Sequence, residues 1–297
     1  MDKQEFILSD DPFNDLKRYF EARRLFDDFL TRMKSGAVHN DGTDELLAII
    51  DKYVFQNKDN PFFITIPKRK KLYRARVVNP DDLNLKKGFG YNERDLLGFN
   101  ETESREPPLG LSCPGRNNIK GSSYLYLSNK ITTACAEVKP GIRRIISLAE
   151  FETVETIKII DFASKKHLDK NVEKINLNRL FTEIMGLYSL PVIKDEEYYA
   201  TQYLSDYIRK TGVDGISYSS YFDDKGINYT IFNSDHRKIK YCGSKLMLSQ
   251  CESKYFLDLN TNKVVHSISC GGKTADVNTT VRIRNNVIKA ISENSKE

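Results

Sequence analysis

The apolar residues of this chain follow a helical period near the N-terminus and change to an alternating, strand-like period at about residue 71. Residues 14–34 carry apolar side chains at the spacing of an amphipathic helix, and residues 46–54 repeat that spacing. Two X-Pro steps between residues 58 and 70 then interrupt the chain. Short alternating runs follow, with a few helical patterns between them. This order predicts an α+β fold in which a helical preface precedes a mixed β core.

The alternating runs predict short strands, and two longer periodic stretches predict helices. The expected strands are 72–78, 145–151, 156–162, 213–220, 228–233 and 241–248, with a hairpin over 254–267. The expected helices in this part of the chain are 171–190 and 195–210. The chain has neither the Gly-x-Gly-x-x-Gly nor the Gly-x-x-x-x-Gly-Lys-Ser/Thr pattern, which argues against a doubly wound nucleotide-binding fold.

Composition excludes several classes of protein. A net charge of +5 over 297 residues, with both signs mixed, argues against a dedicated nucleic-acid binder. The five cysteines never form Cys-x-x-Cys and the four histidines lie far apart, so we expect no metal site and a reducing compartment. The N-terminus has no signal-peptide pattern, and no apolar run approaches the ~18 residues of a membrane span. We therefore expect a cytoplasmic protein that does not contact a membrane.

The stretch from Pro114 to Val138 concentrates the residues that suggest a site. A polar turn bracketed by glycines carries Arg116, and the strand that follows places Tyr124 and Tyr126 on one face. A short helix comes next, and Glu137 lies beside its apolar stripe. An arginine, two tyrosines and a glutamate can therefore converge on one cleft.

Two neighbouring details complete this pattern. Ser128 or Asn129 is a natural N-cap for the short helix. The predicted strand 72–78 places Arg74 and Arg76 on one face, which is unusual unless that face meets solvent or an anion. The connection 79–114 is long and shows little periodicity, which is typical of a functional or mobile loop.

Three pieces of the chain, taken together, resemble the RES family, named for an arginine, a glutamate and a serine. The first is Leu72-Tyr73-Arg74 and the last is Asp214-Gly215-Ile216-x-Tyr218-x-Ser220. The middle block is Gly115-Arg116-x-Asn118-x-x-Gly121, followed by Tyr126-Leu127-Ser128 and Ala134-x-Ala136-Glu137-Val138. The resemblance covers about residues 71–248. We therefore divide the chain into an N-terminal helical region (1–66), a RES-like catalytic domain (67–250) and a C-terminal hairpin and tail (251–297) that packs on it.

The resemblance implies a fold similar to the ADP-ribosyltransferase toxins and an enzyme that consumes NAD+. As a class, members of the family are toxins of bacterial toxin–antitoxin pairs or related effectors. A cognate Xre-type antitoxin would then mask the cleft. NAD+ would be the substrate, with no further cofactor. The helical region could mask the cleft in cis or form homodimer contacts, and the sequence leaves both open.

The resemblance also implies roles for individual residues. Arg74 and Arg116 correspond to the family's arginines, Glu137 to its glutamate and Ser220 to its serine, although Ser219 fits if the register slips. Tyr126 would form a wall of the nicotinamide or ribose pocket. We add the neighbouring Asn118 and Tyr124 as residues that would bind NAD+. The family usually has Gly-Gly-Arg-Trp where this chain has Pro114-Gly115-Arg116-Asn117, so one aromatic contact is missing here.

These residue types suit the chemistry. Cleavage of the nicotinamide glycosidic bond develops positive charge on the ribose, which the Glu137 carboxylate would stabilise. Arginines bind a pyrophosphate through planar forks of donors, and the Ser220 hydroxyl could orient a ribose hydroxyl or the nucleophile. We therefore expect catalytic roles for Glu137, Arg116 and Ser220. Arg74 would bind the substrate.

The sequence leaves the acceptor of the ribosyl group open. Water would make the protein an NAD+ glycohydrolase, and inorganic phosphate would make it a phosphorylase. A mono-ADP-ribosyltransferase would use the same pocket, with the loop 79–114 binding a macromolecular acceptor. A non-catalytic interaction or RNA-binding module built on Lys68 to Lys71 is the remaining alternative, and steep salt dependence of nucleic-acid binding would support it.

Overall fold

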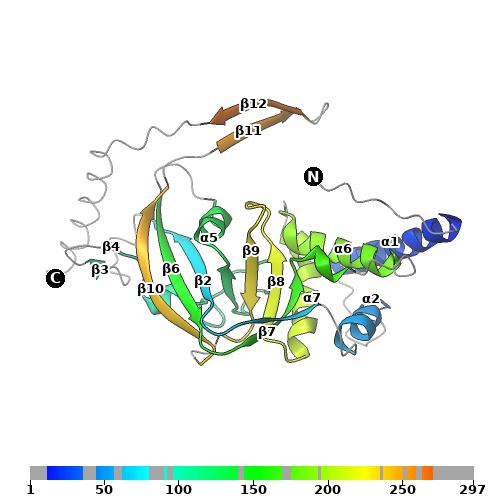
Figure 1. The fold of residues 1–297 in the computed structure, drawn as a ribbon, viewed down its shortest axis with the longest axis horizontal. Helices are drawn as coiled ribbons and strands as arrows, with labels where there is room; N and C mark the ends of the chain where they lie inside the picture. The colour runs from blue at the N-terminus through cyan, green and yellow to red at the C-terminus, as the bar shows by residue number, and fades with distance from the viewer. Residues whose placement is uncertain are drawn as a thin grey trace.

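The computed structural model of the chain describes residues 12–35, 45–56, 62–79, 90–91, 96–139, 144–168, 175–192, 195–234, 237–249, 253–258 and 263–269. Its centre is an eight-stranded sheet with the strand order β1-β7-β8-β9-β5-β2-β6-β10 (Figure 1). The strands are β1 (Phe63–Ile66), β2 (Lys71–Val77), β5 (Leu125–Ser128), β6 (Ile145–Thr153), β7 (Ile157–Phe162), β8 (Gly215–Ser219), β9 (Ile227–Ile231) and β10 (Ile239–Leu248). β7 and β8 are parallel, whereas the other neighbouring strands are antiparallel.

Two small two-stranded sheets accompany the large one. β3 (Gly90–Tyr91) pairs with β4 (Leu96–Leu97), and β11 (Ser253–Asp258) pairs with β12 (Lys263–Ser269). The second pair is the hairpin that the sequence predicts, and its turn lies outside the described residues. In the described part of the chain, short helices connect the strands, namely α4 (Glu101–Ser104), α5 (Ile131–Glu137) and the 3₁₀ turn η2 (Lys165–His167).

The other helices of the described residues gather beside β7 and β8 (Figure 1). They are α1 (Pro12–Ser35), α2 (Glu45–Ile50), the π-helical turn η1 (Asp51–Phe55), α6 (Ile175–Ser189), the 3₁₀ turn η4 (Asp195–Tyr198) and α7 (Tyr199–Lys210). Phe29 of α1, Leu46 of α2 and Tyr188 of α6 are fully buried in one cluster with Phe162 of β7. Burial of each such side chain stabilises the fold by about 1.5–3 kcal/mol. The N-terminal helices therefore share a core with α6, α7 and the sheet.

The two faces of the sheet at β2 differ. On one face Leu72 packs with Phe151 and Leu127 in a second apolar cluster. On the other face Ala75 and Leu148 pack against the helix α5. The alternation of β2 therefore directs successive side chains into different environments.

The hydrogen-bonded ladder of the sheet is interrupted beside α5. β2 pairs with β5 through Tyr73 and Ser128 alone, although it pairs with β6 over its whole length. β5 pairs fully with β9 on its other side. The two halves of the sheet therefore part beyond a single pair of residues, and α5 contacts both strands at this point.

Part of the long connection between β2 and β5 is anchored by Arg105. The buried guanidinium donates to the carbonyl oxygens of Ser234 (2.9 Å) and Ile239 (2.7 Å), and it pairs with Glu101 at 2.8 Å. Residues 80–89 and 92–95 of this connection lie outside the described residues, so its expected role in binding an acceptor stays a prediction.

The structure confirms the α+β fold with an N-terminal helical preface and a mixed sheet. It also contains the strand β1, which the sequence pattern did not indicate. β1 has only four residues and lies between prolines, so its alternation is too short to detect. It forms because it pairs with β7 at the sheet edge. The domain boundaries stay a prediction.

Two details of the prediction are wrong. The stretch 195–210 is not one α-helix, because its first turn is the 3₁₀ turn η4. The N-cap of α5 is Lys130, without a side-chain cap, rather than Ser128 or Asn129. Both of those side chains bond to β9 instead, since Ser128 Oγ donates to Asn228 Oδ1 and Asn129 Oδ1 accepts from the Ile227 N–H. Within the described part of the chain, no helix has the length and apolar character to cross a membrane.

Candidate active site

A cavity of about 220 Å³ lies where β2 and β5 part. It is bounded by strands on both sides of the interruption and by α5. The lining residues are Tyr73, Arg74, Ala75, Tyr126, Leu127, Ser128, Ala134, Glu137, Val138, Tyr218 and Asn228. Three of the seven residues predicted for the site, Arg74, Tyr126 and Glu137, therefore line this cavity.

Glu137, at the last position of α5, is held by two hydrogen bonds to the same carboxylate oxygen. Ser220 Oγ and Asn228 Nδ2 each donate to Glu137 Oε1 at 2.6 Å. Asn228 is itself oriented, because its Oδ1 accepts from Ser128 Oγ at 2.8 Å. Among the described residues, Oε2 of Glu137 has no hydrogen-bond partner. The network thus fixes the carboxyl group and leaves one oxygen for a ligand.

The structure distinguishes Ser220 from Ser219. Ser220 follows β8 and bonds to Glu137, and its Oγ also accepts from the Phe222 N–H at 3.1 Å. Ser219 Oγ donates instead to the carbonyl oxygen of Ala163 at 3.0 Å. Ser220 is therefore the serine that the fold brings to the glutamate.

Arg74 lines the cavity from β2. Its Nη1 donates to the carbonyl oxygens of Ser104 (2.7 Å) and Arg105. Burial, and then the like charge of Arg76, lowers the pKa of the Arg74 guanidinium to about 10. At neutral pH the group is still a cation, and its position suits an anionic part of a ligand.

Arg116 has a different environment from the one the sequence suggests. Its Nη1 and Nη2 donate to the carbonyl oxygens of Leu187 and Leu190, both at 2.7 Å, at the C-terminal end of α6. The guanidinium carbon also lies 5.6 Å from the centre of the Tyr198 ring. Arg116 is not among the lining residues of the cavity. The side chain ties its loop to α6, and its catalytic role stays a prediction.

Tyr126 lines the cavity, and Asn118 supports it from behind. Tyr126 Oη donates to Asn118 Oδ1 at 2.6 Å and accepts from the Asn117 N–H at 3.1 Å. Burial raises the pKa of Tyr126 well above its ordinary value, so the phenol stays protonated. Asn118 and Tyr124 do not line the cavity. Tyr124 instead packs edge-on against Phe232, with ring centres 5.1 Å apart.

Among the polar lining residues, the sequence analysis did not identify Tyr73, Ser128, Tyr218 and Asn228 as site residues. Tyr73 and Tyr218 belong to the RES-like motifs of the sequence, and this membership could have indicated them as site residues. Burial, with the Glu137 charge acting in the same direction, raises the pKa of Tyr218 to about 12. Asn228 had no local signal, because only the pairing of β9 with β5 brings it to Ser128. In the ranges that the structure describes, no group of three His, Cys, Asp or Glu side chains could hold a metal ion.

Comparison with known proteins gives a family match that spans much of the chain. The model of the RES domain matches residues 99–252, which is more than half of the 297 residues. No curated protein matches the sequence. Among solved structures, the MbcT–MbcA toxin–antitoxin complex of M. tuberculosis is similar with a TM-score of 0.35 and 9% identity, over 63% of this chain and 87% of that one.

Proposed function

Since this chain belongs to the RES domain family, we propose that it degrades NAD+ by cleaving the bond between nicotinamide and the ribose. The observation that carries the proposal is the position of Glu137. Two donors hold Oε1 of its carboxylate, and the residue lines a cavity together with Arg74 and three tyrosines. A fixed carboxylate beside a cation and aromatic walls suits a substrate with a cationic ring, a ribose and a pyrophosphate.

The reaction needs little more than this arrangement. The bond from ribose C1′ to the nicotinamide nitrogen breaks, and its electron pair stays on the nitrogen, which becomes neutral. Positive charge develops on C1′ and the ring oxygen, where a carboxylate stabilises it. An oxygen nucleophile then bonds to C1′ and releases its proton. Water gives ADP-ribose, and inorganic phosphate gives ADP-ribose phosphate.

The other lining residues have roles that follow from their chemistry. Tyr73, Tyr126 and Tyr218 line the cavity, and their aromatic rings would contact the nicotinamide, which is a cation only while it is attached to the ribose. Arg74 would pair with a phosphate oxygen. Ser220 donates to Glu137 in the free protein and can turn toward a ribose hydroxyl when the substrate binds.

We also propose that the protein is the toxin of a toxin–antitoxin pair and acts on NAD+ in a bacterial cytoplasm. Membership in the RES domain family supports this, and an antitoxin that covers the cavity would suppress the activity. Expression of the chain without an antitoxin should therefore lower cellular NAD+ and stop growth. Growth with unchanged NAD+ would contradict this proposal.

The test of the activity is a product assay. The purified protein is incubated with NAD+, with and without inorganic phosphate, and nicotinamide, ADP-ribose and ADP-ribose phosphate are resolved. Release that requires phosphate identifies a phosphorylase, and release without phosphate identifies a glycohydrolase. If NAD+ labelled in its adenine half is used and the label becomes attached to protein, the enzyme is instead a mono-ADP-ribosyltransferase. No release under any of these conditions would contradict the proposal.

A further inference from the structure

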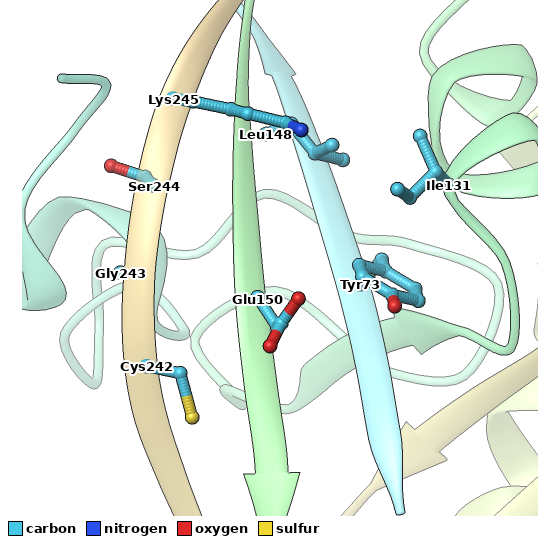
Figure 2. A pocket seen from close by; sticks show the side chains of 8 residues that line it. All are labelled: Tyr73, Ile131, Leu148, Glu150, Cys242, Gly243, Ser244 and Lys245. Atoms are coloured by element: carbon cyan, nitrogen blue, oxygen red, sulfur yellow. The ribbon is translucent and has the colours of Figure 1, made fainter. Parts of the chain in front are cut away.

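A second cavity of about 260 Å³ lies beside the first, over β2, β6 and β10 (Figure 2). The two cavities share Tyr73, and α5 contributes to both, through Ile131 in the second and Glu137 in the first. Tyr73 of β2 pairs with Glu150 of β6, so both side chains stand on the same face of the sheet. The two cavities therefore adjoin at Tyr73.

A bulge in β10 makes room for this cavity. The pairing of β10 with β6 shifts between Tyr241 and Gly243, and Gly243 then pairs with Glu150. Gly243 has φ +135°, a conformation that favours glycine, and a Cβ added there would meet no atom within 4 Å. No side chain therefore covers Glu150 from this position.

The second cavity has an apolar floor with opposite charges beside it. Lys245 pairs with Leu148, and its side chain extends over β6 toward it (Figure 2). Within the described part of the chain, the Lys245 ammonium has no ion-pair partner. Glu150 Oε1 pairs with Lys71 Nζ at 2.8 Å. Tyr73, Ile131 and Leu148 supply the apolar surface between the two charged groups.

Within the described part of the chain, the first cavity is lined by no second cationic side chain for a pyrophosphate. Among the described residues that line the first cavity, Arg74 is the only one with a cationic side chain. Arg116 does not line it, because its guanidinium binds carbonyl oxygens of α6. Lys245 is a cation that lines the adjoining cavity. The charges on the two cavities therefore complement a ligand whose anionic groups lie between two ring systems.

We propose that the second cavity binds the AMP half of NAD+, an inference that rests on the proposed function. Lys245 binds the adenosine phosphate as a point charge. The adenine ring lies on the surface formed by Tyr73, Ile131 and Leu148, and its amino group donates to Glu150. The nicotinamide mononucleotide half then lies beside Glu137, with Tyr73 between the two halves.

The direct test is a calorimetric titration with AMP, which needs no turnover. Wild type should bind AMP, and Lys245→Glu should weaken this binding at least about tenfold, because an attraction becomes a repulsion. Lys240→Glu is the matched control on the same strand outside the cavity, and it should bind AMP as wild type does. No AMP binding by wild type, or equal weakening in both variants, would overturn the proposal. Inorganic phosphate that competes with AMP while adenosine does not would reveal only an anion site and would also overturn it.

A substrate comparison tests the base and separates this proposal from the proposed function. Nicotinamide mononucleotide lacks the AMP half, so its KM should exceed that of NAD+ in wild type and should not change in Lys245→Glu. Hypoxanthine presents an acceptor where adenine presents its amino group. Nicotinamide hypoxanthine dinucleotide should therefore have a KM about tenfold above that of NAD+. Glu150→Gln should reduce this difference between the two KM values.

Equal KM values for NAD+ and nicotinamide mononucleotide would sink the assignment of the second cavity and leave the proposed activity standing. Conversely, a wild-type protein that releases no nicotinamide but binds AMP through Lys245 would contradict the proposed activity and support the nucleotide site. Melting temperatures of all variants show whether a change in KM reflects a change in folding.

Discussion

Asn228 Nδ2 donates a hydrogen bond of 2.6 Å to Glu137 Oε1, although the two residues are 91 positions apart in the chain. The Glu137 carboxylate can only accept hydrogen bonds, so the Nδ2 side of the Asn228 amide faces it while Oδ1 accepts from Ser128 Oγ. The sheet thus directs an amide N–H at the carboxylate through a side chain that cannot flip without losing its bond to Glu137. Asn228 is a positioning residue for Glu137.

Replacement of Asn228 should therefore lower activity through Glu137. We expect Asn228→Ala to lower kcat about 10- to 100-fold with a smaller change in KM, because a hydrogen bond to a charged group is worth about 1.5–3 kcal/mol. Ser128→Ala should have a weaker effect in the same direction, since it frees the amide without removing it. Steady-state kinetics of nicotinamide release measure both. A kcat equal to that of wild type in Asn228→Ala would contradict this role.

The adjacent serines provide a matched pair of variants. Ser220→Ala removes a donor to Glu137 and should lower kcat about 10- to 100-fold. Ser219→Ala removes only the bond to the Ala163 carbonyl oxygen and should stay within about threefold of wild type. The same nicotinamide assay measures both variants. The reverse order of effects would show that Ser219 is the functional serine.

Arg116 should act mainly on stability. A lysine cannot reach both carbonyl oxygens that the guanidinium binds, so Arg116→Lys should lower the free energy of unfolding by about 1–3 kcal/mol. Urea unfolding measures this loss, and the KM for NAD+ should stay within about threefold. A large increase in KM with unchanged stability would instead support direct contact of Arg116 with the substrate.

Asp223 links the loop after Ser220 to the first turn of α5. Its Oδ2 accepts from Thr133 Oγ1 at 2.6 Å and Thr132 Oγ1 at 3.2 Å. The bond from Thr133 is the largest cause that lowers the pKa of Asp223 below its ordinary 3.8. A carboxyl group with a lowered pKa in the folded state contributes stability above its unfolded pKa. That stability is lost as the pH falls through the folded pKa.

The stability difference between wild type and Asp223→Asn should therefore be largest near neutral pH and shrink below about pH 4. Urea unfolding at several pH values measures it. Asp224→Asn, which changes the exposed neighbour, is the control and should show no such trend. If the stability difference between wild type and Asp223→Asn grew as the pH fell, the ionised carboxylate of Asp223 would not be the stabilising form.

Much of the fold follows from local sequence patterns. The periods of 72–78 and 145–151 predict β2 and β6 because each run has enough residues to show its alternation. β1 is too short for that and depends on pairing with β7. The prediction of the α5 N-cap was wrong for a related reason. The Ser128 and Asn129 side chains bond to β9, which is distant in sequence.

The candidate site is predictable only in part. The motifs indicated Glu137 and Ser220, and the structure joins them directly. Asn228 enters through strand pairing, which no local pattern encodes. Arg116 looked available for a ligand because it stands in a polar, glycine-bracketed turn. Its partners are carbonyl oxygens of α6, whose position depends on the packing of the whole helical layer.

The most direct measurement of the central claim is the rate of nicotinamide release from NAD+ by Glu137→Gln. The amide keeps an oxygen that can accept from Ser220 and Asn228, so the fold should be preserved while the negative charge is lost. Glu155→Gln, in the exposed turn before β7, is the control. The account predicts at least about a 1000-fold lower rate for Glu137→Gln and an unchanged rate for the control. Nicotinamide release by Glu137→Gln at the wild-type rate would contradict the account.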